Sequence, residues 1–128
     1  MFVAQLTTQQ QGLLLQLGTE LVAADGKIHD KEAELLAVVR AQMTPGIAPV
    51  SSDQLCKEFT TQASKAALLL ELIGLAHADA DYHSTEQSFV AQVANKLGIA
   101  KEMLEDMEAW VARQLALVRE AEQFMEGK

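Results

Sequence analysis

One stretch of the sequence occurs twice. Residues 24–32 read Ala-Asp-Gly-Lys-Ile-His-Asp-Lys-Glu, and residues 78–86 read Ala-Asp-Ala-Asp-Tyr-His-Ser-Thr-Glu, 54 positions later. The flanking apolar residues keep the same offset: Leu14 with Leu68, Leu15 with Leu69, Leu21 with Leu75, Leu35 with Phe89, Leu36 with Val90 and Val39 with Val93. An internal repeat of this length is typical of one supersecondary unit used twice. The sequence therefore predicts two pseudo-symmetric helical hairpins.

The composition favours an all-α fold. The 128 residues include only two prolines and seven glycines, whereas the helix-forming residues Ala, Leu, Glu, Gln and Met are abundant. This length fits one domain, residues 1–128, with a real core. We expect a single-domain helical bundle with a first repeat over about 8–43, a loop over 44–51, a second repeat over about 52–98 and a long C-terminal helix over about 100–125.

Local signals add detail to the two repeats. Thr7 and Gln10 form a capping-box pattern at the start of the first helix. Gly12 and Gly18 are expected to weaken that helix. The almost wholly apolar segment 64–78 is expected at the centre of the core. At the start of the second repeat, a short helix with Leu55, Cys56 and Phe59 is expected to bury the thiol of Cys56, the one cysteine of the chain.

The last predicted helix is strongly amphipathic. Its apolar stripe consists of Met103, Met107, Trp110, Val111, Leu117, Val118, Ala121 and Met125. We expect this stripe to close over both hairpins, since an uncovered helix of this length would expose a large apolar area. The alternative use of a stripe rich in Met and Trp is as a surface for protein partners, including a homodimer.

The net charge of −8 restricts the class of partner. An acidic surface repels nucleic-acid phosphates and anionic lipids, so nucleic acid and direct membrane insertion are disfavoured. Cations and basic protein surfaces are better candidates. The sequence opens with no pattern of a signal peptide, and its apolar runs are too short to span a bilayer. We therefore expect a cytoplasmic protein.

The repeated stretch also carries the residues best suited to chemistry. Each copy places a histidine and a glutamate three positions apart at a helix start, with an aspartate one turn earlier. The candidate metal ligands are Asp25, His29, Glu32, Asp79, Asp81, His83 and Glu86. If the two hairpins meet, this set could hold a divalent metal ion of unknown identity. Imidazole ligands favour manganese, iron or zinc, whereas carboxylates alone favour calcium or magnesium.

A structural role fits some of the same residues. Glu32 and Glu86 can each serve as the second half of a capping box, and acidic groups in a first turn suit the helix dipole. The repeated aspartates have no equally good structural explanation. No nucleophile elbow, Cys/His pair or phosphate-binding loop is present, so no catalytic residue is predicted. A binding domain is favoured over the alternatives, a metal-dependent enzyme using the same cluster or a purely structural interaction domain.

The repeated Ala-Asp-Gly-x-Ile-x-x-x-Glu pattern, followed by an apolar helix and by Leu-Gly-Ile at 97–99, resembles the tellurite-resistance TerB-like family. The resemblance implies an all-α fold of two helical units and an association with bacterial stress response or tellurite resistance. It also implies a metal-linked role without a known reaction. The acidic motif positions of the family fall on Asp25, Glu32, Asp79 and Glu86, and its turn glycine falls on Gly26. The second copy departs from the pattern, since Ala80 replaces that glycine.

Overall fold

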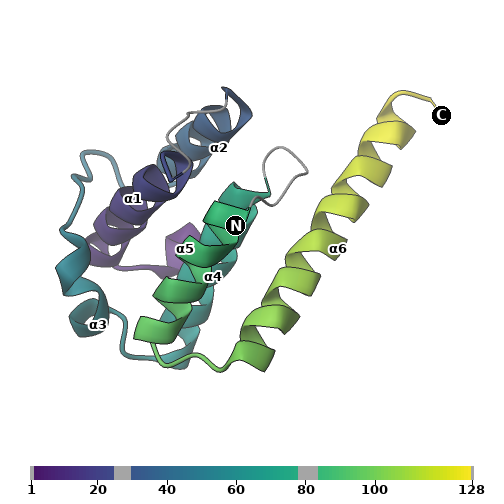
Figure 1. Cartoon of the computed structure of the whole chain (residues 1–128). Helices are drawn as coiled ribbons and strands as arrows, with labels where there is room; N and C mark the ends of the chain where they lie inside the picture. The colour runs from purple at the N-terminus through teal and green to yellow at the C-terminus, as the bar shows by residue number, and fades with distance from the viewer. Residues whose placement is uncertain (1, 25–29, 78–83, 128) are drawn as a thin grey trace.

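The fold is all-α, as expected. The computed structural model describes residues 2–24, 30–77 and 84–127, and this part of the chain contains helices and no strand. The elements in chain order are the 3-10 helix η1 (Val3–Gln5), α1 (Thr8–Val22), α2 (Asp30–Ala41), the 3-10 helix η2 (Ser52–Gln54), α3 (Leu55–Glu58), α4 (Gln62–Ala76), α5 (Ser84–Lys96) and α6 (Lys101–Met125) (Figure 1). None of these helices combines the length and the apolar character needed to cross a bilayer.

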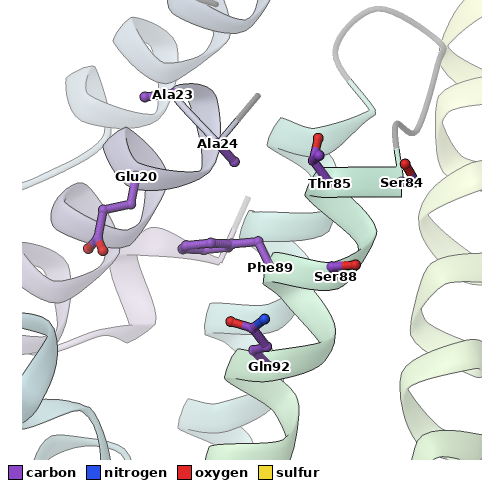
Figure 2. Close-up of a pocket in the computed structure, with 8 residues that line it drawn as sticks. All are labelled: Glu20, Ala23, Ala24, Ser84, Thr85, Ser88, Phe89 and Gln92. Atoms are coloured by element: carbon purple, nitrogen blue, oxygen red, sulfur yellow. The ribbon is translucent and has the colours of Figure 1, made fainter. Parts of the chain in front are cut away.

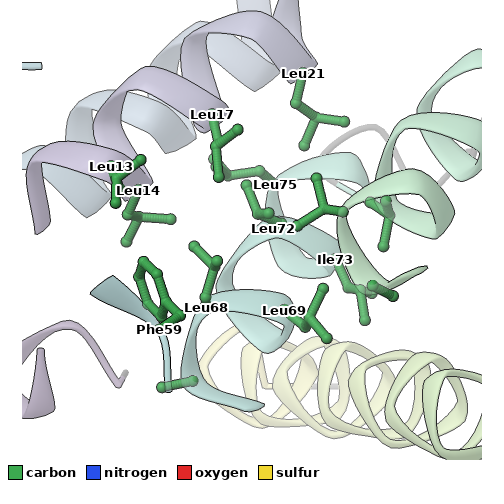
Figure 3. Close-up of a cluster of buried hydrophobic side chains, with 14 of the residues drawn as sticks. Leu13, Leu14, Leu17, Leu21, Phe59, Leu68, Leu69, Leu72, Ile73 and Leu75 are labelled. Carbon is green, nitrogen blue, oxygen red and sulfur yellow. The ribbon is translucent and has the colours of Figure 1, made fainter. Parts of the chain in front are cut away.

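Helix α4 lies at the centre of the core, which confirms the prediction for the apolar segment. It contacts α1, α2, α5, α6 and η1. Its side chains Leu68, Leu69, Leu72 and Ile73 are completely buried (Figure 3). A helix that is apolar on nearly all sides can only be stable when other elements cover each of its faces. The remaining helices are therefore arranged around α4.

The helix boundaries follow the repeat in the sequence. α4 begins and ends 54 positions after α1, and α5 begins 54 positions after α2. The caps also correspond, because the hydroxyl oxygens of Thr7 and Thr61 accept hydrogen bonds from the backbone N–H groups of Gln10 and Ser64, each at 3.1 Å. Thr7 and Gln10 complete the predicted capping box. That the two hairpins are related by a pseudo-twofold axis stays a prediction.

The loop after α2 packs tightly on the start of α1. The backbone N–H of Val50 donates to the carbonyl oxygen of Gly12 at 3.1 Å. The buried side chain of Gln11 donates to the carbonyl of Leu6 at 3.0 Å and accepts from the backbone N–H of Thr44 at 2.8 Å. A Cβ at position 12 would lie 2.5 Å from Val50 Cγ2. Gly12 therefore permits this close approach of the loop to α1. From the sequence, we predicted only that Gly12 weakens the helix.

Two glycines in helices provide a matched test of this packing. Gly12→Ala would also bring its Cβ to 2.6 Å from the carbonyl oxygen of Ala48, so we expect it to lower the free energy of unfolding by about 1–3 kcal/mol. Gly74→Ala, within α4, meets no atom within 4 Å and should raise it by up to about 1 kcal/mol through helix propensity. Chemical denaturation of both variants measures the difference. A stabilising Gly12→Ala would contradict the packing described here.

Helix α6 spans almost the predicted residues, but the expectation that its whole stripe is buried was wrong. Leu104, Met107 and Val111 are buried, and the helix packs chiefly on α4 (Figure 1). Beyond this contact the stripe leaves the core. Leu117, Val118 and Met125 are exposed, because α4 ends before it can cover them. α6 therefore packs on α4 and does not close over both hairpins.

The expectation of a buried thiol was also wrong. Cys56 is exposed, and its Sγ donates a hydrogen bond to the carbonyl oxygen of Lys96 at 3.3 Å. Its neighbours Leu55 and Phe59 are buried. These two are four positions apart and share a face, whereas Cys56 lies about 100° further round the helix. The short helix therefore buries one narrow face only.

Candidate functional site

A cavity of about 620 Å³ opens between α1 and α5 (Figure 2). Glu20, Ala23 and Ala24 line it from the C-terminal end of α1, and Ser84, Thr85, Ser88, Phe89 and Gln92 line it from α5. The ring of Phe89 extends from α5 toward α1 (Figure 2). The two helices contact each other, so the cavity is held between packed elements.

The cavity lies where both copies of the repeated stretch connect to the helices. Ala24, at one side, directly precedes the first copy's Asp25 in the chain. Ser84, at the other side, directly follows the second copy's His83. The C-terminal end of α1 and the N-terminal end of α5, each of which connects to one copy, therefore lie at one cavity.

Most of the predicted ligands lie outside what the structure describes. Asp25 and His29 of the first copy do so, as do Asp79, Asp81 and His83 of the second. Glu32 lies within α2, but its side chain is outside the described part. Among the described residues, no group of three or more His, Cys, Asp or Glu is placed to hold a metal ion. The predicted metal cluster thus stays a prediction.

Glu86 is the one predicted ligand whose side chain is described, and it is buried. It lies in the first turn of α5, and only 1% of its surface is exposed. Removing a carboxylate from water is costly unless polar groups or a cation compensate. The positive end of the helix dipole provides part of this compensation. A solvent-facing capping residue would not require such burial, so Glu86 is more constrained than the capping role alone predicts.

The cavity supplies oxygen atoms that the sequence interpretation did not single out. The lining residues that carry side-chain oxygen atoms are Glu20, Ser84, Thr85, Ser88 and Gln92. One carboxylate oxygen of Glu20 accepts a hydrogen bond from the Gln16 side chain at 3.2 Å. Oxygen-rich surroundings suit hard cations such as calcium or magnesium. Ser84, Ser88 and Gln92 are spaced by four residues, which places them on one face of α5. This spacing could have indicated the polar face from the sequence alone.

His77 ends α4 just before the second copy of the repeated stretch. It is half-buried, and burial lowers the pKa of its imidazole, while the carboxylate of Glu108 on α6 raises it by a smaller amount. The folded protein therefore favours the neutral imidazole.

This shift predicts a pH dependence of stability. Because the folded-state pKa of His77 lies below its unfolded value of about 6.5, the neutral form stabilises the fold above that pH. This contribution is lost as the pH falls below about 6.5 toward the folded-state pKa. We expect the unfolding free energy to decline less between pH 7 and pH 5 in His77→Gln than in the wild type. Denaturation curves across this range measure it, and equal declines would contradict the assignment.

The described helices define an all-α domain in which a central apolar helix packs against α1, α2, α5 and the long terminal helix α6. Residues 49–109 match the model of the family described as Tellurite resistance protein TerB. This match supports a TerB-like tellurite-resistance domain over those residues, and it confirms the resemblance that the motif indicated. The match extends from the end of the loop to the first third of α6 and includes the second copy of the repeated stretch. No curated protein and no solved structure matches the chain significantly.

Proposed function

We propose that this TerB-like domain is a non-enzymatic, cytoplasmic binding domain for a divalent metal ion, associated with stress response or tellurite resistance. In this proposal the ion lies next to the cavity between α1 and α5. The ligands come from Asp25, His29 and Glu32 of the first copy and from Asp79, Asp81, His83 and Glu86 of the second. The bound ion then affects how the domain associates with protein partners.

The observation that carries this proposal is the position of the cavity. Ala24 of the first copy of the repeated stretch and Ser84 of the second copy line the same cavity. A domain with two separate acidic turns, each serving only its own helix, would not need this arrangement. Several carboxylates brought close together repel one another, and a cation relieves that repulsion.

The burial of Glu86 and the overall charge give further support. A carboxylate exposed by only 1% already lies in the first turn of α5, two residues from Ser84. The net charge of −8 raises the local concentration of cations around the molecule. No histidine, cysteine or lysine is among the residues that line the described cavity. The oxygen-rich lining is more typical of cation binding than of proton transfer or nucleophilic catalysis.

Calorimetric titration of metal-free protein tests the proposal. Chelator-treated protein is titrated separately with Mn²⁺, Ca²⁺, Mg²⁺ and Zn²⁺. We expect one of these ions to bind with one ion per chain. The double variant Asp25→Asn/Asp79→Asn should weaken that binding at least about 10-fold, because it removes one carboxylate from each copy.

The matched control removes the same charge elsewhere. Glu102 and Glu105 are exposed on α6, and Glu102→Gln/Glu105→Gln lowers the negative charge by the same amount. If the ion binds at the repeated stretch, this control keeps the wild-type affinity. Equal weakening in both double variants would mean that the ions respond only to net charge, and the proposal would fail. Absence of binding by all four ions would also overturn it.

A further inference from the structure

The exposed half of α6 carries a regular apolar row. Met103, Trp110, Leu117 and Phe124 are spaced by seven residues, so they follow one face of the helix along its whole length. Exposure is higher along the second half of this row, at 63% for Leu117 and 78% for Phe124, against 37% for Trp110. Seven-residue spacing of apolar residues is the pattern by which helices pair.

The first half of this row borders an apolar groove. A cavity of about 470 Å³ is lined by Phe2, Leu70, Met103, Met107 and Trp110, together with the charged residues Asp106 and Arg113. The rings of Phe2 and Trp110 lie with their centroids 6.0 Å apart and form one wall. Such a groove is large enough to accept an aromatic side chain, and exposed aromatic residues beside apolar grooves are typical anchors of protein interfaces.

The total surface area is larger than is typical of a monomer of this mass. The chain exposes 7380 Å², whereas a monomer of 13.9 kDa is expected to expose about 6,700 Å². A helix that projects beyond the core gives such an excess, and a standard interface would bury about 800 Å² of each partner. The projecting part of α6 contributes several of the most exposed large apolar side chains among the described residues.

We propose that a second copy of this chain covers the apolar row, with the two α6 helices antiparallel and the twofold axis next to Leu117. At 1.5 Å per residue, Trp110 and Phe124 each lie about 10 Å from Leu117 along the helix, in opposite directions. The antiparallel arrangement therefore places Leu117 against the partner's Leu117. It also places Trp110 against the partner's Phe124, so that this ring enters the groove.

Charge complementarity supports this orientation. Asp106, Arg113 and Glu120 form a second row of seven-residue spacing at one edge of the apolar row, and all three are exposed. In an antiparallel pair, the same edge of each helix meets the other. With the axis at Leu117, Arg113 lies within about 2 Å along the axis of the partner's Glu120. Two symmetry-related ion pairs result, which offset part of the repulsion between two chains of charge −8.

Sedimentation of the full chain over a range of concentrations tests the dimer. We expect a concentration-dependent dimer at physiological ionic strength, accompanied by a shift of the Trp110 emission as the indole is covered. Leu117→Glu should raise the dimer dissociation constant more than about 10-fold, because it places two carboxylates together at the axis. Val38→Glu is the matched control, since Val38 is also exposed but lies on α2. It should leave the dimer unchanged.

A charge exchange tests the orientation separately. Arg113→Glu alone and Glu120→Arg alone should each weaken dimerisation, and the combined variant should restore it, because opposite charges again meet. In a Cys56→Ser background, Leu117→Cys should form a disulfide-linked dimer under mild oxidation, whereas Val38→Cys should not. Both substituted positions are exposed, and circular dichroism verifies that each variant keeps its helices.

Three outcomes would overturn the proposal. The chain would sediment as a monomer at every concentration if a different protein covers this face. A dimer unaffected by Leu117→Glu would use another surface. A combined charge variant that fails to recover dimerisation would exclude the antiparallel pairing.

Discussion

The packing of α1 against α4 is the contact on which the rest of the structure depends. Leu14 and Leu68 are both fully buried in it, as are Leu21 and Leu75, and each pair occupies equivalent positions of the sequence repeat. Burying one leucine contributes about 1.5–3 kcal/mol, so the loss of either helix from this contact would remove most of the core. Because α2 and α5 follow these two helices, their contact also fixes where the repeated stretches leave the described core.

Buried polar side chains at the edge of this core hold the neighbouring chain segments in place. The buried side chain of Gln11 connects Leu6, before α1, with Thr44, after α2. The carboxylate of Glu71, buried on α4, accepts the backbone N–H of Phe2 at 2.7 Å. A buried polar group is stable only with a partner, so each of these residues selects one position for the segment that it binds.

The sequence predicted the parts of the fold that local rules determine. The central position of α4 followed from its composition, and Thr7 with Gln10 formed the expected cap. Features that depend on distant neighbours were not predictable. The close approach of Val50 explains Gly12, and the sequence gives no sign of that contact. An amphipathic stripe likewise shows that a helix has an apolar face, but Leu117 is exposed because of where α4 ends.

In the candidate site, too, some features follow from local sequence rules and others depend on distant neighbours. The spacing in the sequence indicated that Glu86 lies at the start of a helix, and it does lie in the first turn of α5. Its burial, however, depends on the elements packed around it. Glu20 and Gln92 belong to no motif, and only the contact between α1 and α5 brings them to one cavity. The metal ligands themselves stay a prediction. What the structure adds is the common position of Ala24 and Ser84, which links the two copies.

The central claim is that both copies of the repeated stretch serve one ion site. Adding substoichiometric Mn²⁺ to isotope-labelled protein and recording amide NMR spectra tests it directly, because a bound paramagnetic ion broadens only nearby signals. The amides of Ala24 and Thr85 should broaden together at the same metal concentration, while that of Thr61, at the opposite end of α4, stays sharp. Broadening of only one of the two, or equal broadening of all exposed acidic segments, would contradict the claim.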